Sequence, residues 1–170
     1  YSVRGKEQGN MARYIVDSQI DNHEKYYFIR EQESQDIVLL PSKYLMHKKR
    51  SKLSPNTIRR SAGAISYYLN YIDETGIQLD DVWEMPYDKQ QEHFTDYLIW
   101  LQAGLHSGDS YKKKPYNETC NAYLKEVFRF YRFSGQQDES TKQLKVLSDM
   151  RIIVHNSVGV KRTLYRNTFH

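Results

Sequence analysis

The chain has 170 residues, 39% of them hydrophobic, which is enough to bury the core of one domain, and its formal net charge is +4. Its one cysteine, Cys120, excludes an internal disulfide framework and a cysteine-based zinc site. No apolar run approaches the roughly 18 residues that cross a bilayer, and no signal-like segment opens the chain. We therefore expect a cytoplasmic protein with no membrane partner.

Charge is segregated into blocks along the chain. Residues 41–72 contain seven lysine and arginine residues and no acidic residue, and residues 110–135 carry six bases against two acids. Between these blocks, residues 73–109 carry nine acids and a single base, Lys89. Such blocks predict two basic surfaces and one acidic surface, which favours a polyanionic partner.

The first forty residues predict a small β-structure. Two β-prone runs, residues 12–16 and 25–30, flank a segment rich in turn-forming residues, which is typical of a hairpin. A third apolar run, residues 37–40, ends before Pro41 and is a candidate edge strand. A short helix is then expected over residues 42–50, with Tyr44 and Leu45 toward the core.

The clearest helical pattern begins at Ser54, a good N-cap that is followed by Pro55 at the first helical position. Apolar residues then recur at steps of three and four, which predicts one buried face. These residues are Ile58, Ala62, Ile65, Leu69 and Ile72. The opposite face carries Asn56, Arg60, Gly63 and Tyr67, with Arg59 on its flank. Gly76 is the expected end of this helix.

Two further helices are expected over residues 88–102 and 116–133. Their predicted buried side chains are Phe94, Leu98 and Leu101 in the first, and Cys120, Leu124, Val127, Phe128 and Tyr131 in the second. An acidic, non-helical connection over residues 76–87 precedes them. After Gly135 we expect a linker, and then two strands over residues 151–154 and 160–165.

This order of elements resembles the core-binding domain of the tyrosine recombinases, the phage and mobile-element integrase family. The resemblance covers about residues 40–136 and is carried by the helix opening LSPNTIRR and by the helix NETCNAYLKEVFRFYRF. Ser54 and Thr57 form the Ser-x-x-Thr of the first helix, and the second ends in clustered aromatic residues. The resemblance implies a mainly α fold: a SAM-like four-helix bundle, here with a small N-terminal β-hairpin and a C-terminal β-like tail.

In that family the bundle packs against one side of the recombination site, and with the catalytic domain it forms a clamp around double-stranded DNA. Two of its helices meet the major groove. On this sequence they correspond to residues 54–72 and 116–133, the helices that adjoin the two basic blocks.

The residue types at these helices suggest roles in DNA binding. Phosphate neutralisation is expected from Lys48, Lys49, Arg50, Lys52, Lys112, Lys113 and Lys114, and Lys125 joins the same surface. Contacts with base edges suit Asn56, Arg59, Arg60, Asn117 and Asn121. Thr57, Tyr116 and Thr119 can reach backbone or bases, and the amides at residues 54–57 can receive a phosphate. Gly63 would let the helix backbone approach DNA closely, or would serve close packing against another helix.

Strand cleavage in this family needs a catalytic domain with an arginine, a lysine, a His-x-x-Arg motif and a nucleophilic tyrosine. The one His-x-x-Arg here, His47 to Arg50, lies ahead of the binding module inside a basic run, and we reject it as catalytic. We therefore expect no catalytic residue, metal or cofactor in this chain. It should bind DNA as a monomer and cleave nothing, while the full-length recombinase would assemble on DNA at a bacterial nucleoid.

Three segments are expected: a β appendage over residues 1–40, a DNA-binding domain over 41–136, and a linker with a hairpin over 137–170 leading toward an absent catalytic domain. The appendage has a net charge of −2, which argues against strong DNA affinity and favours docking on the bundle, with the C-terminal strands as a possible partner. A helix-turn-helix regulator is a competing reading, but residues 76–87 separate the helices too widely. A bundle that binds only proteins would leave the basic blocks without a role.

Overall fold

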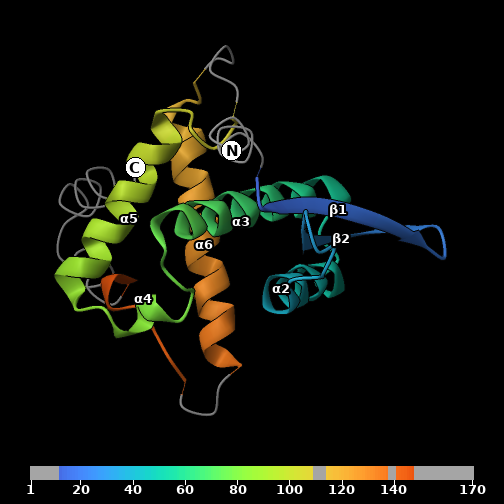
Figure 1. Ribbon diagram of the computed structural model, residues 1–170. Helices are drawn as coiled ribbons and strands as arrows, with labels where there is room; N and C mark the ends of the chain where they lie inside the picture. The colour runs from blue at the N-terminus through green and yellow to red at the C-terminus, as the bar shows by residue number, and fades with distance from the viewer. Residues whose placement is uncertain (1–11, 109–113, 138–140, 148–170) are drawn as a thin grey trace.

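The computed structural model describes residues 12–108, 114–137 and 141–147. The elements in chain order are β1 (Tyr14–Asp21), β2 (Glu24–Glu31), α2 (Leu39–Arg50), α3 (Pro55–Thr75), α4 (Asp81–Glu84), α5 (Tyr87–Gln102) and α6 (Asn117–Gln136). The described part of the chain is thus mainly helical, with one antiparallel two-stranded sheet at its N-terminal side (Figure 1). The predicted fold class is confirmed for these residues. The β-like tail expected over residues 151–165 lies outside them.

Helix α3 occupies the centre of the molecule and contacts α2, α5, α6 and both strands (Figure 1). The Ser54 hydroxyl accepts a hydrogen bond from the Thr57 amide at 3.2 Å, and Gly76 ends the helix with a φ of 75°. The predicted apolar face of α3 is buried along its whole length, from Ile58 to Ile72. This confirms the start, the end and the inward face that the sequence predicted.

The other predicted core residues of α2, α5 and α6 are buried as well. Burial raises the pKa of the Cys120 thiol to about 11, so this cysteine behaves as a small hydrophobic side chain.

A buried chain of polar side chains joins three helices inside this core. The Tyr68 hydroxyl of α3 lies 2.8 Å from His93 Nε2 of α5 and 2.6 Å from the Tyr131 hydroxyl of α6. The Tyr131 hydroxyl in turn donates to the Leu79 carbonyl at 3.2 Å. Every member is satisfied when Tyr68 donates to Tyr131 and a neutral His93 donates to Tyr68. Burial lowers the pKa of His93 to about 4, which keeps its ring neutral.

A second buried cluster ties α2 to α6 through the Glu126 carboxylate. Glu126 accepts a hydrogen bond from the Tyr44 hydroxyl, and its oxygens lie 3.1 Å from Lys48 Nζ and 3.2 Å from an Arg129 guanidinium nitrogen. Burial alone would raise the pKa of Glu126, but the Tyr44 hydrogen bond and the Lys48 charge outweigh it, and the pKa is lowered. Glu126 therefore stays ionised and stabilises the α2–α6 contact.

Residues 141–147 pack on the core through three buried side chains, whereas the sequence suggested a linker from residue 137 onward. Leu144, Val146 and Leu147 are buried, and residues 145–147 form a helical turn. The Lys145 amide donates to Gln90 Oε1 at 2.9 Å, and Lys145 Nζ donates to the Trp83 carbonyl at 2.8 Å. The expected domain boundary at residue 136 is therefore too early.

Two further expectations differ from the structure. The proposed edge strand over residues 37–40 is reduced to a single bridge between Arg30 and Ile37, and α2 starts at Leu39. Pro41 is accommodated in the first turn of α2, where its missing N–H leaves no hydrogen bond unmade. The acidic connection expected to be non-helical contains the one-turn helix α4, whose Val82 and Trp83 are buried.

The hairpin is longer than the β-prone runs indicated, because its polar middle is also extended. Its two-residue turn, Asn22 and His23, has positive φ at both positions, 51° and 67°, as a type I′ turn requires. The Asn70 side chain of α3 binds both backbone groups of Tyr14: its Oδ1 accepts from the Tyr14 amide at 2.9 Å, and its Nδ2 donates to the Tyr14 carbonyl at 3.1 Å. The hairpin is thus docked at its base, and its tip projects away from the bundle (Figure 1).

Acidification should destabilise the protein through His93. The pKa of His93 is about 4 in the folded protein, against 6.5 for an ordinary histidine, so the unfolded chain binds the proton first and stability falls as pH drops between these values. The full interval corresponds to about 3 kcal/mol of unfolding free energy. Urea unfolding at several pH values measures this slope. His93→Gln, which can hydrogen-bond but does not titrate, should flatten it, whereas His23→Asn in the hairpin turn should not; an unchanged slope in His93→Gln contradicts the assignment.

Glu126→Gln should cost about 3 kcal/mol of unfolding free energy, because it leaves Lys48 without its buried counter-charge. The matched control is Glu92→Gln, whose carboxylate lies 3.9 Å from Lys89 with both side chains more than 60% exposed. Breaking that exposed pair should change stability by less than about 1 kcal/mol. Chemical denaturation of both variants provides the comparison, and equal effects would show that the α2–α6 cluster contributes no special stability.

Candidate nucleic-acid interface

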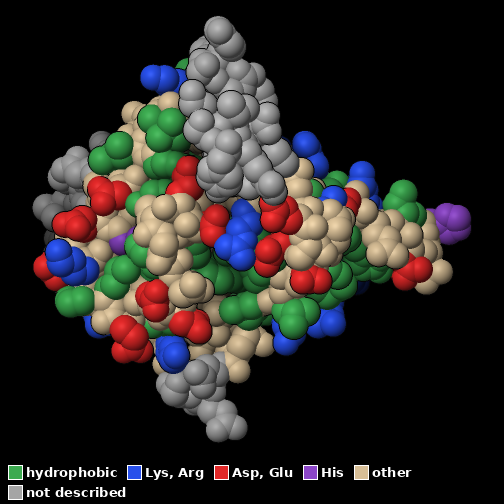
Figure 2. Space-filling view, in the orientation of Figure 1, with side chains coloured by type: hydrophobic (Ala, Val, Ile, Leu, Met, Phe, Trp, Pro, Cys, Tyr) green, Lys and Arg blue, Asp and Glu red, His purple; other side chains and the backbone are tan. Residues whose placement is uncertain are grey.

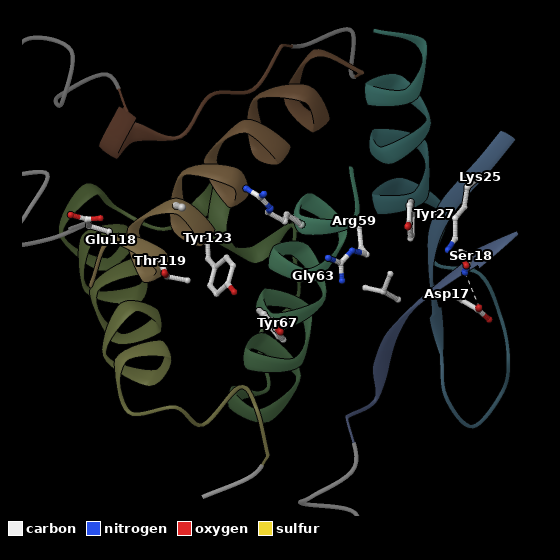
Figure 3. A pocket seen from close by; sticks show the side chains of 13 residues that line it. Asp17, Ser18, Lys25, Tyr27, Arg59, Gly63, Tyr67, Glu118, Thr119 and Tyr123 are labelled. Atoms are coloured by element: carbon white, nitrogen blue, oxygen red, sulfur yellow. Dashed lines mark hydrogen bonds between the residues drawn. The ribbon is translucent and has the colours of Figure 1, made fainter. Parts of the chain in front are cut away.

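An open groove of about 870 Å³ lies between the hairpin, α3 and α6, and we call it the hairpin–helix groove (Figure 3). The hairpin contributes Val16, Asp17, Ser18, Lys25 and Tyr27; α3 contributes Arg59, Arg60, Gly63 and Tyr67; α6 contributes Glu118, Thr119, Ala122 and Tyr123. The groove therefore has three walls, each built by a different part of the chain.

The α3 wall is the polar face that the sequence predicted. Since the apolar stripe points into the core, Arg59, Arg60, Gly63 and Tyr67 point outward and line the groove. The Arg59 guanidinium donates to Asn56 Oδ1 at 3.0 Å, which holds both side chains near the start of the helix. Arg60 makes no hydrogen bond or ion pair with another described residue, so its charge is available to a ligand.

Gly63 leaves the backbone of α3 bare on the floor of the groove. A Cβ placed at this position would meet no heavy atom within 4 Å among the described residues. Close helix packing, one of the two explanations that the sequence allowed for this glycine, is therefore wrong. The missing side chain instead keeps space open in front of the helix.

Aromatic rings line the α6 side of the groove. Tyr67 of α3 contacts Tyr123 of α6 with ring centroids 5.3 Å apart, and Tyr67 also contacts His106 at 4.7 Å. Thr119 lies one turn before Tyr123 and faces the same space (Figure 3). Hydroxyl groups and ring edges therefore stand beside the arginines, a combination suited to a polar, planar or phosphorylated ligand.

The hairpin wall carries one cation and one neutralised acid. Arg30 binds the Asp17 carboxylate at 2.8 Å, and this hydrogen bond lowers the pKa of Asp17. Lys25 Nζ lies 5.6 Å from the centre of the Tyr27 ring and has no ion pair with a described residue. From its sequence the hairpin was expected only to dock on the bundle, and Lys25 and Tyr27 were not among the predicted binding residues. The period-two spacing of Lys25 and Tyr27, which places both on one face of the second strand, was the available signal.

Several predicted residues lie at the turn between α2 and α3. Arg50, Lys52, Ser54, Asn56 and Thr57 are exposed there, and the Ser54 and Thr57 hydroxyls lie 2.8 Å apart. The Thr57 amide is already capped by Ser54, so a phosphate cannot take this amide without displacing the cap.

Two predicted phosphate ligands in α2 are compensated inside the protein. Lys48 pairs with buried Glu126, and Lys49 pairs with Glu24 at 3.5 Å while it lies over the Tyr26 ring. Their predicted role as phosphate ligands is corrected for this reason, because their charges already serve the α2–α6 and α2–hairpin contacts.

The start of α6 holds predicted residues in different settings. Tyr116 is 68% exposed, Lys114 is exposed, and the Asn117 Oδ1 accepts from Gln102 at 3.1 Å. Lys125 is half-buried, and Lys112 and Lys113 lie outside the described residues.

Asn121 is only 6% exposed and points into the core. Its predicted contact with a base edge is therefore corrected, because the side chain is buried in the described structure. The predicted residues that the fold does bring together in the groove are Arg59, Arg60 and Thr119.

The expected acidic surface lies over α4 and α5, which contribute no lining to the groove. Its exposed carboxylates are Asp80, Asp81, Glu84, Asp88, Glu92 and Asp96, and Figure 2 shows acidic side chains over this side of the molecule. In the part of the chain that the structure describes, no three histidine, cysteine or acidic side chains are grouped as metal ligands. No helix in that part is both long and apolar enough to cross a bilayer.

The lining of the groove combines the cations of Lys25, Arg59 and Arg60 with the carboxylates of Asp17 and Glu118, beside an open helix backbone and aromatic hydroxyls. Comparison of the chain with protein-family models, with curated proteins and with solved structures gives no match.

Proposed function

We propose that this chain binds double-stranded DNA through the hairpin–helix groove and the N-terminal ends of α3 and α6, as the DNA-binding portion of a site-specific tyrosine recombinase. One observation carries the proposal: Arg59 and Arg60 face an open groove beside the bare backbone of Gly63, with no carboxylate bound to either arginine among the described residues. The family assignment rests on the sequence resemblance, and the DNA surface rests on this geometry.

Arginine suits this role because its planar guanidinium can bind a phosphate or a guanine edge through two hydrogen bonds. The Arg59 bond to Asn56 leaves its other donors available and fixes the direction of the side chain. Because Gly63 has no side chain, a bound DNA strand can come closer to the backbone of α3 than it could with any other residue type at position 63.

The acidic surface over α4 and α5 supports an orientation of the protein in which the groove, and not that surface, faces the DNA. DNA is repelled by that surface and attracted by the cations at the start of α3, so the charge distribution would orient the protein before contact. The proposal assigns binding and not strand cleavage. His47, the histidine of the rejected His-x-x-Arg run, contacts Phe133 with ring centroids 5.1 Å apart and lines no part of the groove.

Replacing both groove arginines, Arg59→Ala with Arg60→Ala, should weaken binding to a random-sequence duplex by about 100-fold at low salt. It should also lower the slope of log K against log[salt] by about 2, because roughly one counterion is released per phosphate contact. Fluorescence anisotropy at several salt concentrations measures both quantities. Both side chains are exposed, so the core should be unaffected, which circular dichroism checks.

Lys89→Ala is the matched control, since Lys89 lies on the acidic helix α5 and outside the groove. It should leave affinity and slope unchanged. If the wild-type chain fails to bind the duplex at low salt, or if the double variant binds like the wild type, DNA binding through this groove is wrong.

A further inference from the structure

We propose that the β1–β2 hairpin is a DNA-binding wall, which holds one sugar–phosphate strand over the hairpin–helix groove with Lys25 as its phosphate ligand. This inference rests on the proposed function and adds an element that the charge of the N-terminal segment argued against. It is carried by the register of the hairpin, its fixed position, and the placement of its charges.

The register divides the hairpin into two faces. Directly paired residues point to the same side, so one face carries Tyr14, Val16, Ser18 and Ile20 from β1 with Lys25, Tyr27, Ile29 and Glu31 from β2. The base of this face packs on the bundle, since Ile29 is fully buried and Val16 and Tyr27 contact the core. The same face therefore continues outward past the bundle and overhangs the groove.

The overhanging end presents a hydroxyl, a cation and an apolar side chain. Ser18 and Lys25 line the groove, and Ile20 beyond them is 69% exposed. Lys25 and Arg59 lie on the hairpin and α3 walls respectively (Figure 3). Phosphates and deoxyribose alternate along a DNA strand, so cations with an apolar side chain nearby match that alternation.

The charges of the hairpin are arranged so that its groove face is cationic although its composition is acidic. Asp17 also lines the groove, but by register it lies on the opposite face of the hairpin together with Arg30, which pairs with its carboxylate. The acid on the inner face, Glu31, lies at the docked base and pairs with Arg13 at 3.4 Å. Lys25 is thus left as the uncompensated charge at the overhanging end of the described inner face.

The hairpin is also held in place before any ligand binds. Asn70 and the Ser66 hydroxyl bind Tyr14 at the base, and the Ser42 hydroxyl accepts from the Ile29 amide at 3.2 Å. Near the tip, Lys49 of α2 pairs with Glu24. A pre-positioned wall loses little conformational entropy on binding, which favours a direct contribution to affinity.

The test places a new cation on either face of the hairpin. Ser18→Lys adds a charge to the inner face, whereas Gln19→Lys adds the same charge one residue later on the outer face. Anisotropy with a random-sequence duplex should show tighter binding and a salt slope larger by about 1 for Ser18→Lys, and a clearly smaller change for Gln19→Lys. Lys25→Ala should weaken binding about tenfold and lower the slope by about 1, with Lys89→Ala unchanged.

Equal effects of Ser18→Lys and Gln19→Lys, together with wild-type binding by Lys25→Ala, would overturn the hairpin inference. In that case, loss of binding in the Arg59 and Arg60 double variant would still support the groove face of α3. If the wild-type chain binds no DNA, both the inference and the proposed function fail.

Discussion

The burial of one face of α3 determines where nearly everything else in the molecule lies. Ile58, Ile65 and Leu69 are within 3% of full burial, and each contributes roughly 1.5–3 kcal/mol relative to exposure. Rotating the helix would expose these side chains and carry the charges of Arg59 and Arg60 toward the core. Burial of the apolar face therefore fixes the rotation of α3 about its axis. This fixes the direction in which Arg59 and Arg60 point into the groove.

Tyrosine, of which the chain has fifteen, serves both the core and the groove in this arrangement. Inside, Tyr68 and Tyr131 fill volume while their hydroxyls bind each other and His93, so the helices are joined by directional bonds as well as by apolar contact. At the groove, Tyr67 and Tyr123 present the same ring and hydroxyl to solvent. The adjacent residues Tyr67 and Tyr68 of α3 thus lie in the groove and in the protein core respectively.

The sequence predicted what local periodicity and capping can encode. The four long helices, their buried stripes and the outward position of Arg60 follow from spacing over a few turns. The errors concern contacts between distant segments. Lys48 was taken for a phosphate ligand because its counter-charge, Glu126, lies far along the chain, and the core position of Leu144 depends on Lys145 binding carbonyls that precede α5. The position of the hairpin beside the groove likewise depends on a distant contact, the hydrogen bonds between Asn70 of α3 and Tyr14.

The hairpin has a property that the helices lack: its strands can be lengthened without changing the side to which its side chains point. Adding two residues to each strand lengthens it by about 7 Å and returns every side chain to its original side, whereas adding one reverses them all. Because Tyr14 and Ile29 dock at the base, such an extension would leave the bundle untouched. Changes in hairpin length can therefore adapt the same helical bundle to ligands of different width.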